Sequence, residues 1–551
     1  MNYICKVRWL VTYVFLLATA YGQSAPKDPR LPHLEKRGQA TQLIVDGKPF
    51  LVLGGELHNS SASSLTYMKP VWPRLTAMHL NTVLLPISWE QFEPEEGKFD
   101  FTLIDGLLRD ARQNHLRLVL LWFGSWKNTY SSYVPLWVKR DVDRFPRVET
   151  RDHRGTERLS PFSDGNRDAD ARAFATLMRH LRETDSDAHT VLMVQVENEV
   201  GVIPDSRDRS AAADKAFSAP VPKELTQYLQ QHRISLVPEL RAIWEAGGAK
   251  TSGTWQELFG SGHQTDDLFM AWHYARYIED LATAGKKEYP LPMFVNAALI
   301  RPNYQPGQYN SGGPLPHSMD IWRAGAPVVD FLAPDIYFDN FAEWAQKYNC
   351  SGNPLFIPEA LSNSAPQNVF YAFGQQQAFG FSPFGIDGEG SSEPDEAGRS
   401  LAASYATLSH LAPLVLEKQS EGKIASLILE NDAQPTGRIS LGDYTMNATR
   451  AIRTASPEAA RERAAAILLQ MGPDEYVIAG SGNMNISFSS NSPGLPIVGI
   501  GSIDEETFTD GQWTAGRRLN GDENAQGQLL RLNGGPRNQS AIYHVRLYRY
   551  R

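Results

Sequence analysis

Two glutamates that each follow an apolar run have the chemistry of a paired acid and base. Glu199 lies in Val191-Leu-Met-Val-Gln-Val-Glu-Asn-Glu-Val-Gly201, and Glu359 ends Pro354-Leu-Phe-Ile-Pro-Glu359. Cleavage of a glycosidic bond needs one carboxyl group to protonate the leaving oxygen and a second to attack the sugar or activate water from the opposite face. Either glutamate alone could equally be a salt-bridged structural group. As a pair, they favour catalysis.

The apolar runs before these glutamates are typical of buried parallel strands. Residues 191–196 are largely apolar on both faces of a strand, as expected where helices cover both sides of a sheet. Glu197, Asn198 and Glu199 follow at the carboxyl end of this run, which is where parallel α/β folds place their chemistry.

Similar apolar runs recur along the chain and alternate with segments of helical periodicity. The predicted strands are residues 50–54, 81–85, 116–122, 191–196, 293–299, 328–337, 355–359 and 378–387. Helical spacing is found in residues 63–79, 103–113, 168–183 and 400–417. Eight strands in this alternation predict an α/β protein with a (β/α)8 TIM barrel.

The chain is long enough for a barrel and one smaller domain. We expect a catalytic barrel over residues 23–421, with a helix-rich insertion at about 204–289 that covers part of the active face. Short β-rich runs separated by Gly, Asn, Asp and Pro predict a smaller β-sandwich-like domain over residues 422–551. One helix is expected within it, at residues 457–469.

Composition describes a globular protein and argues against nucleic acid as a partner. Apolar residues make up 42% of the chain and charged residues 21%. The formal charge of −9 comes without any basic block that could follow a phosphate backbone.

The first residues have the pattern of a signal peptide. Lys6 and Arg8 precede an apolar run at residues 9–18, and small residues follow at 18–20. We therefore expect residues 1–22 to be removed and the protein to be exported, to the periplasm or outside the cell. Cleavage would leave Cys350 as the single cysteine, so no intramolecular disulfide is expected. No run is long enough for a membrane span.

Three groups of residues match a known family: Gly55-Glu-Leu-His58 at the first strand end, Asn81-Thr-Val with Trp89, Glu93-Pro94, Glu96-Gly97 and Phe99 around the second, and Val194-Gln-Val-Glu-Asn-Glu-Val-Gly201 at the fourth. They resemble glycoside hydrolase family 35, the retaining β-galactosidases. The resemblance spans most of the barrel and is most specific at Gln195 to Gly201.

The resemblance implies a role for each matching residue. Glu199 would be the acid/base, Asn198 would bind the sugar 2-hydroxyl, and Glu359 would be the nucleophile. Members commonly have Tyr where this chain has Pro86, and Ala-Glu where it has Gly124-Ser125. The implied activity is that of a secreted, exo-acting retaining β-galactosidase that releases terminal β-galactose from plant-wall-type oligosaccharides.

Further side chains at strand ends are candidates for substrate contacts. Glu56 could bind a sugar hydroxyl or make a structural hydrogen bond. Trp126 lies past a strand in a polar loop, which makes it the best candidate for an aromatic sugar platform; Trp89 and Trp122 are the alternatives. Tyr337 could hydrogen-bond the nucleophile.

Glu197 stands two residues before Glu199, so on a strand it would point the same way. We interpret it as a structural group buried below the site and held by an arginine or by backbone amides.

No metal or organic cofactor is implied. The histidines at 58, 79, 273 and 317 show no ligand spacing, and no His-Glu-x-x-His motif occurs. The expected partner is an oligosaccharide substrate, and the sequence indicates no oligomeric state. Two alternatives stay open: another retaining β-glycosidase or endo-β-glycanase of the same barrel clan, and a non-catalytic carbohydrate-binding barrel.

Overall fold

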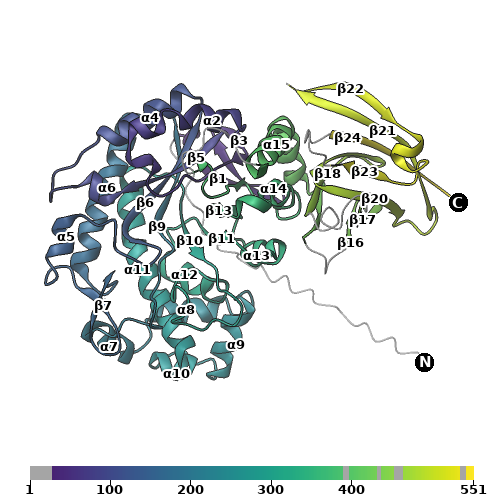
Figure 1. The fold of residues 1–551 in the computed structure, drawn as a ribbon. Helices are drawn as coiled ribbons and strands as arrows, with labels where there is room; N and C mark the ends of the chain where they lie inside the picture. The colour runs from purple at the N-terminus through teal and green to yellow at the C-terminus, as the bar shows by residue number, and fades with distance from the viewer. Residues whose placement is uncertain (1–27, 389–395, 431–435, 452–462, 510, 534–541) are drawn as a thin grey trace, which may run out of the picture.

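The computed structural model describes residues 28–388, 396–430, 436–451, 463–509, 511–533 and 542–551. A body of parallel strands and helices occupies one side of the molecule, and the C-terminal antiparallel sheets occupy the other (Figure 1). The predicted signal peptide lies outside the described residues.

A six-stranded parallel sheet forms most of the inner layer. Its order is β5 (Thr82–Ser88), β6 (Arg117–Lys127), β9 (Val191–Asn198), β10 (Met293–Ala298), β11 (Phe331–Ile336) and β13 (Glu359–Ala360). Each neighbouring pair is parallel, so all six carboxyl ends meet at the same edge.

A second parallel sheet contains the short strands β12 (Phe356–Ile357), β14 (Gly380–Phe381) and β4 (Val52–Leu53). Backbone bridges join Glu56, just after β4, to Leu84 of β5 and to Phe384. The prediction of an α/β fold with parallel strands is therefore confirmed as a curled parallel sheet, and complete (β/α)8 closure stays a prediction.

Apolar side chains from successive strands fill the inside of this curl. One buried cluster includes Val52, Leu84, Val119, Leu121, Met193, Phe294, Phe331, Phe356 and Phe379. The rings of Phe294 and Phe331 stack with centroids 4.9 Å apart, and those of Phe356 and Phe379 with centroids 5.3 Å apart. This aromatic packing gives the strand ends above it a rigid base.

Helices cover the outer face of the strands. They include α4 (Thr102–Gln113), α6 (Asp164–Asp185), α11 (His263–Glu288), α12 (Met319–Gly325), α13 (Phe341–Tyr348), α14 (Ala365–Gly374) and α15 (Glu396–Glu421). Shorter elements before β9 are β1 (His33–Arg37), β2 (Ala40–Val45), β3 (Lys48–Phe50), α1 (Leu65–Met68), α2 (Val71–Ala77), α3 (Trp89–Phe92), α5 (Leu136–Arg140), β7 (Arg147–Glu149) and β8 (Gly155–Leu159). None of the described helices is long and apolar enough to span a membrane.

The segment between β9 and β10 is helical, as its sequence pattern predicts. It contains α7 (Ala211–Ser218), α8 (Lys223–Gln231), α9 (Pro238–Ala246), α10 (Trp255–Phe259) and the long α11. Helix α11 packs against α6 and α12, so the end of this segment belongs to the outer layer of the sheet (Figure 1).

The C-terminal strands form two antiparallel sheets. One has the order β15 (Ile424–Leu429), β18 (Ala464–Gly472), β19 (Glu475–Ser481), β24 (Ile542–Tyr550), β21 (Ile497–Thr509) and β22 (Gln512–Leu519). The other has the order β16 (Thr436–Leu441), β17 (Tyr444–Arg450), β20 (Asn483–Ser490) and β23 (Leu530–Asn533). A buried apolar cluster contains residues of both sheets, as a β-rich region requires.

The predicted helix at residues 457–469 is wrong where it overlaps β18. Ala464 to Leu469 pair with β15, Ala465 to Leu469 also pair with β19 on the other side, and all six residues are buried. A central strand buried on both faces has the same continuous apolar run as a buried helix, so periodicity does not separate the two. Residues 457–462 lie outside the described residues.

The C-terminal sheet packs directly on α14, the helix that follows β13 and Glu359. Ser426 Oγ of β15 donates a hydrogen bond to the Phe370 carbonyl at 2.7 Å. Gly374 at the end of α14 lies against Ser426 and Ile467, where there is no room for a side chain.

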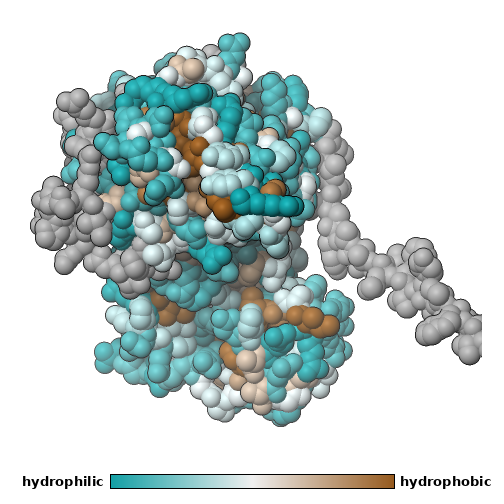
Figure 2. Space-filling view, turned by 90° about the vertical axis from the view of Figure 1, so that its right-hand side faces the viewer, coloured by the Kyte–Doolittle hydropathy of each residue, from teal (hydrophilic) through white to brown (hydrophobic). Residues whose placement is uncertain are grey.

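On the side of the molecule shown in Figure 2, hydrophobic residues form small groups separated by hydrophilic ones.

We expect Gly374→Ala to loosen this contact. The added Cβ would lie 1.9 Å from Ser426 Oγ and 2.7 Å from the Ala425 carbonyl oxygen, and overpacking of this kind costs roughly 1–3 kcal/mol. Thermal unfolding should show a lower midpoint than in the wild type. Gly494→Ala is the matched control, because nothing lies within 4 Å of its added Cβ. Equal midpoints for the two variants would contradict a tight contact.

Candidate active site

The two sequence-predicted catalytic glutamates meet at the carboxyl edge of the parallel sheet, together with a third acid. One carboxylate oxygen from each of Glu199, Asp335 and Glu359 lies within 4.8 Å of the other two. Only 8%, 1% and 3% of these residues, respectively, is exposed. Neighbouring strand ends therefore unite residues that are far apart in the sequence.

Glu359 is held by donors from three other strand ends. Asn198 Nδ2 and Asn296 Nδ2 donate to Oε1 at 3.2 and 3.4 Å. The Tyr337 hydroxyl donates to Oε2 at 2.7 Å, which is the contact expected from the sequence. These three hydrogen bonds fix the orientation of the Glu359 carboxyl group.

Glu199 is oriented by an unusual backbone conformation. Its φ is 45°, its N–H donates to Asn296 Oδ1 at 2.9 Å, and its carbonyl accepts from Asn310 Nδ2 at 3.1 Å. Glu197 also has a left-handed φ, of 62°. Non-glycine residues adopt this region at a cost, and such strain often marks functional sites.

The left-handed backbone overturns the prediction that Glu197 and Glu199 point the same way. The carboxylate of Glu197 turns to β6, where it accepts from the N–H groups of Ser125 and Trp126 at 3.0 and 2.6 Å. Glu199 instead faces Asp335 and Glu359. The period-two alternation of a strand fails here because the chain leaves extended geometry. The structural interpretation of Glu197, a buried group held by backbone amides, agrees with its contacts.

The acids at this site compete for protons. Burial, and then the negative charge of Glu359, raise the pKa of Glu199 to about 7. Burial and the charges of Glu359 and Glu199 also hold the pKa of Asp335 well above its usual range. A hydrogen bond between the Glu199 and Asp335 carboxyl groups raises the pKa of Asp335 and lowers that of Glu199, but burial and the Glu359 charge outweigh it at Glu199. Glu199 is thus poised to hold a proton near neutral pH.

Glu56 and Lys127 complete the charged cluster. Glu56 is fully buried, and neither of its carboxylate oxygens has a hydrogen-bond partner among the described residues. Burial, followed by the charge of Glu359, raises its pKa well above normal. Burial lowers the pKa of Lys127, but four nearby carboxyl groups more than offset this, so the pKa is raised. Lys127 is therefore a buried cation among acids.

Trp126 cannot serve as the predicted sugar platform. It has no exposed surface, its indole N–H donates to the Leu159 carbonyl at 3.1 Å, and its ring packs edge-on against Tyr274 and Tyr277. The alternatives, Trp89 and Trp122, are equally buried. Their indole N–H groups donate to carboxylates, those of Glu93 and Asp170. The prediction fails because these tryptophans support the strand ends from below.

Three site residues were not singled out from the sequence: Asn296, Asp335 and Lys127. Asn296 and Asp335 interrupt the otherwise apolar runs of β10 and β11 and are almost fully buried. A polar residue in a buried strand needs a hydrogen-bond partner. An Asn or Asp within an apolar run can therefore be recognised from the sequence as a candidate site residue. Lys127 ends β6 and gives no comparable signal.

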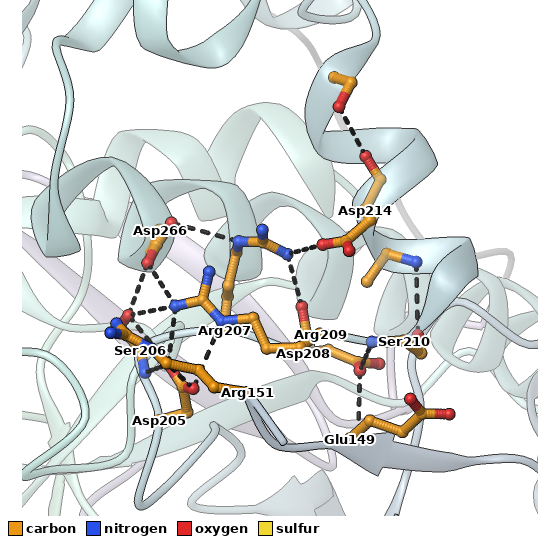
Figure 3. A network of polar contacts seen from close by, with 12 residues as sticks. Glu149, Arg151, Asp205, Ser206, Arg207, Asp208, Arg209, Ser210, Asp214 and Asp266 are labelled. Carbon is orange, nitrogen blue, oxygen red and sulfur yellow. Dashed lines mark hydrogen bonds and ion pairs between the residues drawn. The ribbon is translucent and has the colours of Figure 1, made fainter. Parts of the chain in front are cut away.

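An ionic network fixes the segment that follows Glu199 (Figure 3). Asp266 near the start of α11 accepts from Ser206 Oγ at 2.6 Å and from Arg209 Nη2 at 2.9 Å. Arg207 pairs with Asp214 of α7 at 2.6 Å and with Asp266 at 3.3 Å. The loop that leaves the acid is thereby tied to two helices of the insertion.

The cluster of carboxyl groups is better suited to proton transfer than to binding a metal ion. Carboxylate oxygens are ligands that Mg²⁺ and Ca²⁺ accept. However, Asn198, Asn296 and Tyr337 already donate hydrogen bonds to Glu359, and Asn296 also donates to Asp335 Oδ2 at 2.7 Å. Such a set suits acid–base chemistry.

Comparisons with known proteins point to the same chemistry. Residues 69–249 match the Glyco_hydro_42 family model, described as beta-galactosidase, and residues 401–531 match DUF5597, a domain of unknown function. A curated beta-galactosidase of Xanthomonas manihotis is 28% identical over 219 residues, which are 38% of this chain and 32% of that protein.

Two solved beta-galactosidases are similar in structure. That of Bacillus circulans sp. alkalophilus has a TM-score of 0.45 at 14% identity, over 67% of this chain and 57% of its own. That of Rahnella sp. R3 has a TM-score of 0.44 at 16% identity, over 66% and 57%. The matched regions thus span about a third of the curated relative and just over half of the solved chains.

The family match and the curated relative support a glycoside hydrolase of the beta-galactosidase-like type. They do not single out family 35, and the C-terminal match carries no known function.

Proposed function

We propose that this protein is an exported, exo-acting retaining β-galactosidase that releases terminal β-galactose from plant-wall-type oligosaccharides. The observation that carries the proposal is the buried pair of Glu199 and Glu359, with carboxylate oxygens within 4.8 Å and a pKa of about 7 at Glu199. We take the curled sheet to be part of a closed (β/α)8 barrel. We also retain the resemblance of Gln195 to Gly201 to family 35. The signal-peptide pattern at residues 1–22 supports export.

The geometry supports double displacement. Retaining enzymes hold their two carboxyl groups about 5–5.5 Å apart, whereas inverting enzymes need roughly 6.5–9.5 Å to admit a water molecule. Glu359, oriented by Tyr337 and two asparagines, attacks the anomeric carbon as Glu199 protonates the leaving oxygen. Once Glu359 is esterified its charge is gone, the pKa of Glu199 falls, and Glu199 takes a proton from the attacking water.

Substrate specificity is tested with a panel of aryl glycosides. A β-galactosidase hydrolyses the aryl β-galactoside in preference to the glucoside, xyloside and mannoside. An enzyme that ignores all four and cuts internal polysaccharide bonds would be an endo-β-glycanase. Sugar binding without any turnover would instead favour the non-catalytic barrel.

Glu199→Ala should slow substrates with poor leaving groups far more than activated aryl substrates. General acid catalysis contributes roughly 10²–10⁴-fold, and only a poor leaving group needs the proton. Azide should partly restore turnover of the activated substrate, because it replaces the water that has lost its base. Initial rates for both substrates, with and without azide, provide the measurement. Equal losses on both substrates, with no azide effect, would remove Glu199 from the acid/base role.

A 2-fluoro β-galactoside with a good leaving group should label Glu359. Fluorine destabilises the oxocarbenium-like transition state and slows hydrolysis of the glycosyl-enzyme, so the covalent adduct accumulates. Peptide mass mapping locates the label, and proton NMR should detect the β-anomer as the first product. A label on Glu197 or Glu56, or the α-anomer appearing first, would contradict the assignment.

A further inference from the structure

A cavity lies at the end of β6. Asn59, Lys127, Asn128, Tyr130 and Tyr133 contribute to its wall. Lys127 belongs to both this cavity and the charged cluster, since its charge acts on Glu199 and Glu359 while its side chain lines the cavity. The N–H of Asn128 donates to the Asn198 carbonyl at 3.2 Å, which joins the cavity wall to the acid/base strand.

The turn that bears the wall is rigid. Lys127 and Tyr130 exchange two backbone hydrogen bonds, at 2.8 and 3.0 Å. Asn128 and Thr129 between them have φ values of 49° and 70°. Two successive left-handed residues closed by such a pair are typical of a tight type I′ turn. Tyr130 is therefore held in place without the substrate.

Polar groups in the wall have unused hydrogen-bonding capacity. The Lys127 ammonium donates to Asn128 Oδ1 at 2.8 Å, and this is its one hydrogen bond among the described residues. An ammonium group has three donors. Asn59 Oδ1 is a buried acceptor without a partner in the same part of the chain. A buried donor and a buried acceptor thus remain for hydroxyl groups of a ligand.

Tyr130 supplies the exposed aromatic ring that the tryptophans do not. It is 49% exposed. The Arg158 guanidinium lies over it, 4.1 Å from its centroid, so one face is backed by a cation. About half of the residue's surface remains accessible to a ligand. A flat ring combined with a few convergent polar groups is the usual composition of a small-molecule subsite.

We propose that this cavity binds the sugar ring on the leaving-group side of the scissile bond, with Tyr130 stacked on the ring and Lys127 and Asn59 bonded to its hydroxyls. This inference rests on the proposed function and adds a ligand class to it: a neutral β-galactosyl disaccharide or longer oligosaccharide. The aromatic platform predicted at Trp126 is thereby assigned to Tyr130, four positions further along the chain.

The test compares two substrates with alcohol leaving groups, one with a ring and one without. For the full-length protein, kcat/KM is measured with a β-galactosyl disaccharide and with methyl β-galactoside. Tyr130→Ala should lower the disaccharide-to-methyl ratio by about tenfold, mainly through KM, and Tyr130→Phe should restore it. Tyr67→Ala, which removes another exposed tyrosine, should keep the wild-type ratio.

The possible results distinguish failure of the proposed subsite from failure of the proposed activity. An unchanged ratio in Tyr130→Ala, or a Tyr130→Phe ratio as low as that of Tyr130→Ala, would overturn the subsite while leaving the β-galactosidase proposal intact. A wild type that hydrolyses neither substrate would overturn the proposed function, and the subsite with it.

Discussion

Mutual repulsion among buried carboxyl groups is the constraint that governs this site. Two unit charges about 4 Å apart repel by roughly 4 kcal/mol at an effective dielectric constant of about 20. Glu56, Glu199, Asp335 and Glu359 therefore cannot all be ionised, even with Lys127 among them. Glu359 accepts hydrogen bonds from Asn198, Asn296 and Tyr337, whereas burial and the charge of Glu359 raise the pKa of both Glu199 and Asp335.

Several parts of the fold hold these mutually repelling carboxyl groups in place. Aromatic packing inside the curl fixes the strands below the site, and the strained backbone at Glu199 is held by two asparagines. The arginine network anchors the loop beyond it. On the other side, the C-terminal sheet packs on α14, the next α-helix after the strand of Glu359.

The sequence predicted what depends on local pattern. Continuous apolar runs predicted the parallel strands, and polar residues at their ends predicted that Glu199, Glu359 and Tyr337 would meet. Prediction from the sequence failed where contacts between distant parts of the chain determine the local structure. The left-handed φ of Glu197 reversed a side-chain direction, and strand pairing on both sides turned residues 464–469 from a predicted helix into β18.

Burial was the property hardest to predict. Trp126 and Tyr130 both follow the apolar run of β6, yet one is fully buried and the other is half exposed. Nothing in their types or spacing distinguishes a supporting ring from a binding ring. Asp335 and Lys127 likewise gain their importance from neighbours that come from distant strands.

The central claim is that Glu199 holds its proton because of its surroundings, with Glu359 the main nearby charge. Carbon-13 NMR titration of the glutamate side chains in the wild type and in Glu359→Gln tests this directly. The account predicts a pKa of about 7 for Glu199 in the wild type and a clearly lower pKa in the variant, since the removed charge is one that raises it. A Glu199 pKa near the ordinary value in the wild type, or one that does not move in Glu359→Gln, would contradict the account.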